Sequence, residues 1–313
     1  MLTNGFLATF GVNRCATSAT SRASSFMVRG NAASPLSLRR ESAMKCLPRA
    51  VFAALAVTVA QAALAQAPAT VQLEDMTWTE LRDSIRAGKT TLLIPIGGTE
   101  QSGPYVALGK HNARVRVLSE RIAEGLGNAI VAPVIAYVPE GGYAPPTSHM
   151  RFPGTITVPD DAFEKTLESA ANSFRVHGFT NIVFLGDHGG YQNDIKQSVA
   201  RLNKSWAGTG ARAFVPAAYY GTSSDGYDQI LREHGVPAAD IGTHAGLADT
   251  ALLLAVEPRM VRVDKLRNAA KPGAVDGVYG GDPRHASVEL GRLGTDAIVS
   301  RTVDAIRKEI AGR

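Results

Sequence analysis

The chain has 313 residues, of which 33 are basic and 28 are acidic. Residues 1–65 contain seven of the basic residues and one of the acidic residues, so the remaining chain has 26 basic and 27 acidic residues and lacks the excess basic charge typical of a nucleic-acid-binding protein. Cys15 and Cys46 both precede residue 66, which excludes a disulfide framework, a thiol nucleophile and thiolate metal ligands from residues 66–313.

Residues 44–65 have the order of a secretory signal peptide. Residues 44–49 are basic, residues 50–60 are apolar, and residues 63–65 (Ala-Leu-Ala) form a small-x-small cleavage site. The apolar run is too short to span a bilayer as a helix. We therefore expect a secreted, periplasmic protein that has no membrane attachment after signal cleavage.

Residues 1–43 form an extension rich in Ser, Ala and Arg that contains a single acidic residue. Mitochondrial-type transit peptides have that composition. We favour a start codon assigned too early, with Met44 as the true start, and we expect the extension to be disordered if it is translated. Residues 66–313 are then expected to form one hydrolase domain.

Beyond residue 70, segments with helical periodicity alternate with short apolar runs typical of buried strands. Helices are predicted at residues 77–89, 113–126, 160–177, 192–206, 245–256 and 289–310, and strands at residues 91–95, 129–136, 181–185 and 211–218. This alternation indicates an α/β fold, a single-domain three-layer sandwich whose mostly parallel sheet is covered by helices on both faces. In such sheets, ligands bind at the carboxyl ends of the strands.

Polar residues flanked by glycines follow several of these predicted elements. Glu100 comes after the first strand in the segment IGGTEQSGP, and His111 follows eleven residues later. His188 follows the third strand in the segment GDHGG, and Asp249 lies at the start of a predicted helix. Brought together, these four donors would hold a divalent cation with a coordination position open for water. A donor set of His, Asp and Glu suits Zn, Mn or Fe.

Five motifs in this chain resemble the creatininase (creatinine amidohydrolase) family, in the family's order and over about residues 77–310. They are IGGTEQSGPYVALGKHN (96–112), HMRFPGTI (149–156), HGFTNIVFLGDHGG (177–190), THAGLADT (243–250) and GVYGGDP (277–283). The resemblance implies a single α/β sandwich that commonly assembles as a homohexamer. It also implies two divalent metals and hydrolysis of cyclic amides or related C–N bonds, with some members cleaving peptides.

The resemblance also assigns roles to single residues. Glu100 matches the family's first acidic metal ligand, and His188 matches a ligand His. His244 matches a His that resembles a proton-shuttling general acid/base, and Asp249 falls where the family has a ligand Glu.

Two departures from the family pattern change the expected metal site. Ser102 stands where the family has a ligand His, and His111 stands where it has the Asp that bridges the two metals. The set that survives is Glu100, His111 and His188, which is a ligand composition of catalytic zinc and of facial-triad iron sites. We expect one tight metal site, with a second, weaker site near Asp249.

The sequence therefore predicts a metal-dependent amidohydrolase of the EC 3.5 type, which uses metal-activated water on an amide, cyclic amide or peptide. His244 or Asp249 is expected to carry the proton, and Asp187 to orient a ligand from the adjacent position. Tyr143 and Tyr191 are interpreted either as lining the substrate pocket or as ordinary loop packing. Ser102 and His149 are assigned to the surroundings of the same pocket.

The alternative is a degenerate family member that binds a small molecule or a metal in the periplasm without turnover. A serine hydrolase is not indicated, because no Gly-x-Ser-x-Gly elbow is present, and neither a P-loop nor a Rossmann fingerprint follows a strand. The expected partners are a small-molecule substrate and further copies of the chain in a homo-oligomer, a hexamer by the resemblance, with no nucleic acid.

Overall fold

The structure, a computed structural model, describes residues 70–312. The predicted signal peptide at 44–65 and the extension at 1–43 lie outside the described residues. Within 70–312, no helix combines the length and the apolar character needed to cross a membrane.

Four parallel strands form one sheet in the order β2-β1-β3-β4. The two central strands, β1 (Thr91–Ile96) and β3 (Asn181–Gly186), pair along their whole length, from Thr91 opposite Asn181 to Ile96 opposite Gly186. The flanking strands, β2 (Ala129–Val131) and β4 (Arg212–Phe214), are much shorter. The carboxyl ends of β1 and β3 therefore meet at one edge of the sheet.

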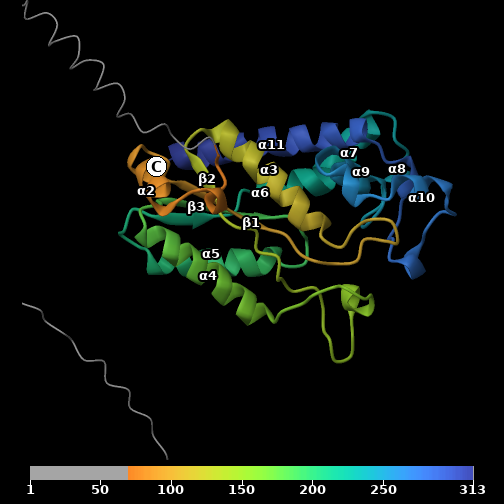
Figure 1. Cartoon of the computed structure of the whole chain (residues 1–313), viewed down its shortest axis with the longest axis horizontal. Helices are drawn as coiled ribbons and strands as arrows, with labels where there is room; N and C mark the ends of the chain where they lie inside the picture. Colours follow the sequence, from red (N-terminus) through yellow and green to blue (C-terminus); the bar gives the residue numbers. More distant parts are fainter. Residues whose placement is uncertain (1–69, 313) are drawn as a thin grey trace, which may run out of the picture. The chain divides into compact units, whose positions relative to one another are not determined.

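Helices cover both faces of this sheet, which confirms the predicted three-layer α/β fold. One layer contains α3 (Lys110–Leu126), α9 (Leu247–Val256) and α11 (Val288–Ala311), and the other contains α2 (Trp78–Arg86), α4 (Asp160–Val176) and α5 (Gln192–Ser205) (Figure 1). Successive strand residues enter opposite cores, because side chains alternate across a strand. Leu92 packs on the α4 side and Leu93 on the α3 side, so β1 has no polar face.

Two predicted strands are shorter in the structure than in the prediction. The segment 211–218 ends as a strand at Phe214, because Pro216 has no N–H to donate to a sheet, and α6 (Ala217–Gly221) begins after it. The segment 129–136 pairs as a strand only to Val131 and then contacts β1 through a single bridge between Ile135 and Ile96.

Short helices fill the connections between the long elements, mostly between β4 and α11. They are η1 (Leu73–Asp75), η2 (Ser148–Arg151), η3 (Thr222–Gly226), α7 (Tyr227–Glu233), α8 (Ala238–Ile241), η4 (Pro258–Met260), α10 (Val263–Asn268), η5 (Ala274–Asp276) and η6 (Pro283–His285).

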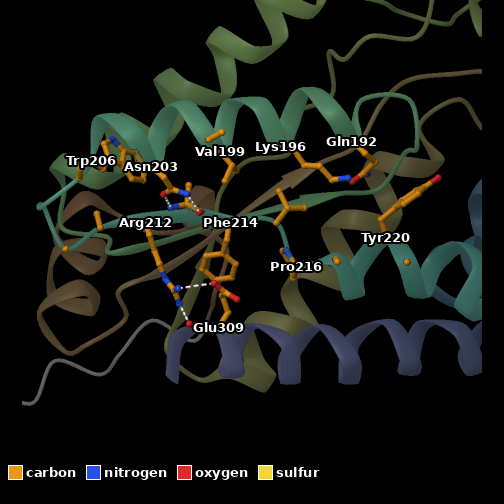
Figure 2. A pocket seen from close by; sticks show the side chains of 18 of the residues that line it. Gln192, Lys196, Val199, Asn203, Trp206, Arg212, Phe214, Pro216, Tyr220 and Glu309 are labelled. Atoms are coloured by element: carbon orange, nitrogen blue, oxygen red, sulfur yellow. Dashed lines mark hydrogen bonds and ion pairs between the residues drawn. The ribbon is translucent and has the colours of Figure 1, made fainter. Parts of the chain in front are cut away.

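Asn203 of α5 closes the outer edge of β4. Its side-chain amide donates to the carbonyl oxygen of Ala213 and its Oδ1 accepts from the N–H of the same residue, both at 2.8 Å (Figure 2). Arg212 pairs with Glu309 of α11 at 3.0 Å, and a cleft of about 940 Å³ lies along this edge. Because Asn203 already satisfies the outward backbone groups of Ala213, the edge is a poor template for another strand.

Close packing of α11 on α9 depends on a glycine in α11. A Cβ atom on Gly291 would overlap the carbonyl oxygen of Ala251 in α9. We predict that Gly291→Ala lowers the free energy of unfolding by about 1–3 kcal/mol, as overpacking does. The matched control is Gly221→Ala, because Gly221 has φ −62° and open space around its Cα. Urea unfolding of both variants checks this, and equal midpoints would contradict the packing described for α9 and α11.

Candidate metal centre

Polar side chains converge at the carboxyl ends of β1 and β3, where a parallel sheet places its ligands. Glu100 lies in the loop after β1, and Asp187 and His188 directly follow β3. Two helix starts and the connection between β2 and α4 contribute further side chains. They are Lys110, His111 and Arg114 from α3, Asp249 from α9, Glu140 from the loop after β2, and His149 from η2.

Glu100 is fully buried at the centre of this cluster. Its Oε1 accepts a hydrogen bond from Nε2 of His111 at 2.8 Å and lies 3.4 Å from Nζ of Lys110. Its Oε2 lies 3.2 Å from Nε2 of His149 and 3.5 Å from Nε2 of His188. Burial by itself raises the pKa of Glu100, but Lys110 and His111 hold it well below its usual range, so the group is a carboxylate at neutral pH.

Glu100, Glu140, His149 and His188 each offer one donor atom, and these four atoms all lie within 4.8 Å of one another. Oε2 of Glu100 and both carboxyl oxygens of Glu140 are buried without a hydrogen-bond partner among the described residues. Such oxygens are costly unless a cation or a donor satisfies them.

The protonation states of the same four residues also fit a divalent cation. Burial lowers the pKa of His188 to about 4 and also lowers that of His149, so both imidazoles are neutral at pH 7, the form that binds metals. Burial and the neighbouring Glu100 raise the pKa of Glu140 to about 9, against a smaller lowering by Lys110, so a positive charge beside this carboxyl group would favour its ionised form. Two carboxyl groups and two neutral imidazoles form a donor set suited to zinc or manganese.

Local backbone geometry makes room for Glu140. Gly98 has φ +145°, and a Cβ atom there would lie 2.7 Å from Oε1 of Glu140. The N–H of Glu140 donates to Oγ1 of Thr157 at 3.0 Å, which holds this otherwise irregular loop against the segment before α4. Gly98 therefore leaves space for a side chain 42 positions further along the chain.

His111 was predicted to be a metal ligand, but in the structure it lies between two carboxylates. Its Nδ1 is 2.6 Å from Oδ2 of Asp187 and its Nε2 is 2.8 Å from Oε1 of Glu100. Burial lowers the pKa of His111, but Asp187 and Glu100 outweigh burial and raise it overall. Both ring nitrogens are thus engaged, and His111 is absent from the four-residue group that the geometry brings together.

Asp187 was predicted to orient a metal ligand beside it, and in the structure it contacts His111. Its carboxylate accepts from Nε of Arg114 at 2.9 Å and from the hydroxyl of Tyr219 at 2.9 Å, in addition to its contact with His111. The residue that it orients is therefore a partner of Glu100.

Asp249 lies on the far side of Lys110 and also differs from its predicted role. Its Oδ1 accepts from Nη1 of Arg114 at 2.7 Å, and its Oδ2 pairs with Nζ of Lys110 and accepts from the N–H of Ala245 at 3.1 Å. Burial raises the pKa of Asp249, but Lys110 and Arg114 hold it well below its usual range. A carboxylate with these partners is outside the four-residue group and is a poor proton acceptor at neutral pH.

His244 faces Glu100 from the turn before α9. Its Nε2 lies 3.0 Å from the carbonyl oxygen of Gln101, and its Nδ1 lies 3.7 Å from Oε1 of Glu100. Burial and then Lys110 lower the pKa of His244 to about 3, so the ring is neutral. Gly277 is required nearby, because a Cβ atom there would overlap the side-chain amide of Gln101.

The three remaining predicted pocket residues lie in different surroundings. Ser102 is buried, and its hydroxyl has no hydrogen-bond partner within residues 70–312. Tyr143 is 68% exposed in the loop between β2 and α4. Tyr191 is fully buried, with its hydroxyl 2.8 Å from the carbonyl oxygen of Ile96 and accepting from the N–H of His188 at 3.0 Å. Tyr191 therefore ties the ends of β1 and β3 together and does not line the pocket.

A pocket of about 390 Å³ opens onto this cluster and is distinct from the larger cleft beside β4. Its inner wall holds His149, His188, His244 and Lys110. Tyr220 and Gly189 line both cavities and separate them. The larger cleft contains none of the four grouped donors, so the smaller pocket is the candidate active site.

Several residues of this centre were not predicted from the sequence, namely Gln101, Lys110, Arg114, Glu140 and Tyr219. Glu140 could have been found by the pattern that identified Glu100 and His188, a polar residue next to glycines, because two glycines follow it in Val-Pro-Glu-Gly-Gly. Lys110 and Arg114 are four residues apart at the start of a helix, which places them on one face, but only the tertiary structure reveals their acidic partners.

The family model described as creatinine amidohydrolase (Creatininase) matches residues 74–306 of the chain. The chain is 26% identical over 261 residues to the creatinine amidohydrolase of Pseudomonas putida, covering 75% of this chain and 95% of that protein. It is 29% identical over 180 residues to the mycofactocin precursor peptide peptidase of Mycolicibacterium smegmatis, covering 56% of this chain and 61% of that one. A solved mutant creatininase of zinc–zinc type has a TM-score of 0.62 at 23% identity, with 77% of this chain and 98% of that chain covered, and it shows the same fold.

The contrast between the two tyrosines yields a test of how the strand ends are held. We predict that Tyr191→Phe lowers the free energy of unfolding by about 1–3 kcal/mol, because buried backbone groups lose their partner. Tyr143→Phe removes the same hydroxyl from an exposed loop and should change stability by less than about 0.5 kcal/mol. Chemical denaturation followed by circular dichroism measures both, and a Tyr191→Phe protein as stable as the parent would contradict the bonding described for its hydroxyl.

Proposed function

The chain belongs to the creatininase family, and from this premise we propose that it is a metal-dependent hydrolase of C–N bonds in amides, cyclic amides or peptides. Two relatives support this reaction class by their names, one a creatinine amidohydrolase and the other a peptide peptidase. The substitutions at Ser102 and His111 alter the family's metal-site pattern, which argues against creatinine itself as the substrate.

One observation carries the proposal. Glu100, Glu140, His149 and His188 bring four donor atoms within 4.8 Å of one another, and His149 and His188 line the pocket. Three buried carboxyl oxygens of Glu100 and Glu140 have no hydrogen-bond partner among the described residues. We propose these four residues as the ligands of one divalent cation, zinc or manganese. Glu140 and His149 thereby replace His111 and Asp249 in the predicted ligand set.

A cation held there supplies Lewis acidity, which activates water and polarises the carbonyl group of the scissile bond. The residues around it restrict and orient the reactants. Glu100 holds its carboxylate fixed through His111 and Lys110, and Asp187 fixes the ring of His111 in turn. The pocket is lined by imidazoles and charged groups on its inner side, so a polar carbonyl compound is the substrate class that fits.

His244 is the residue proposed to carry a proton. Its Nε2 lies 3.0 Å from the carbonyl oxygen and 3.1 Å from the side-chain Nε2 of Gln101, and its Nδ1 lies 3.7 Å from Oε1 of Glu100. The neutral ring can accept a proton at whichever ring nitrogen carries no hydrogen and return it to a leaving nitrogen. Asp249, the other predicted proton carrier, is held by Lys110 and Arg114 and is proposed to keep its charge.

The metal ligands can be tested by removing single donors. We predict that Glu140→Gln and His188→Ala lose the bound metal and more than about 100-fold in hydrolysis, because even partners outside the ligand shell contribute about 10–100-fold. Glu124→Gln, on the exposed side of α3, is the matched control and should retain both.

The measurements are elemental analysis of the purified protein and hydrolysis of a panel of amides, lactams and peptides with the native metal. A metal-free parent protein that hydrolyses the panel would refute the proposed centre. A parent protein with one metal and no hydrolysis of any panel member would favour the alternative, a protein that binds its ligand without turnover.

We further propose export to the periplasm and assembly as a homo-oligomer, which rest on residues 44–65 and on the family resemblance. The expected result is a periplasmic protein whose first residue is Gln66, as determined by amino-terminal sequencing. Recovery from the cytoplasm with residues 44–65 intact would contradict the proposed export.

A further inference from the structure

Lys110 is a buried cation that lies between two carboxylates beside the candidate metal centre. Its side chain is 2% exposed, and its Nζ lies 3.4 Å from Oε1 of Glu100 and pairs with Oδ2 of Asp249. Arg114, one helical turn further along α3, holds the other oxygen of Asp249 at 2.7 Å. A lysine is almost never buried to this extent unless its charge is paired.

The two oxygens of Glu100 face two different positive sites. Oε2 faces His149 and His188 in the proposed metal group, whereas Oε1 faces Lys110 and Nε2 of His111. The carboxylate of Glu100 therefore links the metal group to the ammonium group, in the way that a bridging carboxylate links two metal ions.

The carboxylates of Glu100 and Asp249 both contact the Lys110 ammonium, and Nδ1 of His244 lies 3.7 Å from the same oxygen of Glu100. Carboxylates and imidazoles are metal-binding groups, but with Lys110 present these three residues do not form one of the close donor groups found in residues 70–312. The ammonium group occupies the position between the two carboxylates.

We propose that the ammonium group of Lys110 takes the place of a second divalent cation, so that the centre holds one metal ion and one fixed organic cation bridged by Glu100. This inference rests on the proposed function, because it presupposes a metal at Glu100, Glu140, His149 and His188. It makes Lys110 a positioning residue that sets the number of metal ions and holds Glu100 and Asp249 in place.

The test counts metal ions in the full protein after chelation and re-titration with Mn²⁺. The parent protein should bind one equivalent and give the electron paramagnetic resonance signal of isolated Mn²⁺. Lys110→Ala should bind a second equivalent and give the signal of a magnetically coupled pair, since Glu100 would then bridge two ions. Lys110→Arg keeps the charge and is the matched control, with one equivalent expected.

Outcomes that overturn the inference differ from those that overturn the function. Two equivalents in the parent protein, or a single uncoupled equivalent in folded Lys110→Ala, would overturn the role assigned to Lys110 and leave the metal-dependent hydrolase standing. No metal in the parent protein would overturn both. If Lys110→Ala does not fold, Lys110→Gln removes the charge with less loss of volume, and the same count applies to it.

Discussion

The burial of the Glu100 carboxylate is the constraint on which the rest of the centre depends. Moving a carboxylate out of water costs several kcal/mol even after the protein relaxes, so each of its oxygens must face a positive group or a donor. Oε1 faces His111 and Lys110, while Oε2 faces the imidazoles of His149 and His188. The two oxygens of Glu100 therefore have different neighbours. Oε2 belongs to the proposed metal site, and Oε1 is held by His111 and Lys110.

Beyond the contact between Glu100 and Lys110, a series of buried ion pairs extends through the protein. Glu100, Lys110, Asp249, Arg114 and Asp187 alternate in charge, and each contacts the next. These residues come from the loop after β1, from α3, from α9 and from the end of β3, so the series joins four segments that are distant in sequence. Because removing one partner of a buried pair leaves an uncompensated charge, costing about 3–5 kcal/mol, the series also fixes the shape of the pocket.

Much of this arrangement could be predicted from the sequence, for identifiable reasons. The strands before Glu100 and His188 are continuous apolar runs, and parallel strands deliver the residues after them to one edge of the sheet. The family resemblance added His244 and placed the five motifs in the family's order. These patterns lie within short segments of the chain, so they could be recognised from the sequence without a structure.

Other features depended on contacts that no local pattern encodes. Glu140 and His149 lie in a long connection without regular periodicity, and only folding brings them to Glu100. His111 has the residue type of a ligand, but its two carboxylate neighbours engage both of its ring nitrogens. Tyr143 and Tyr191 both lie beside glycines, and burial alone separates a surface side chain from one that ties two strands together.

The position of the bound cation tests this account most directly. Crystals grown with zinc and measured at the zinc absorption edge should give an anomalous peak about 2.0–2.2 Å from donor atoms of Glu100, Glu140, His149 and His188. A peak between Glu100 Oε1 and Asp249, or on Nε2 of His111, with none among those four residues, would contradict it.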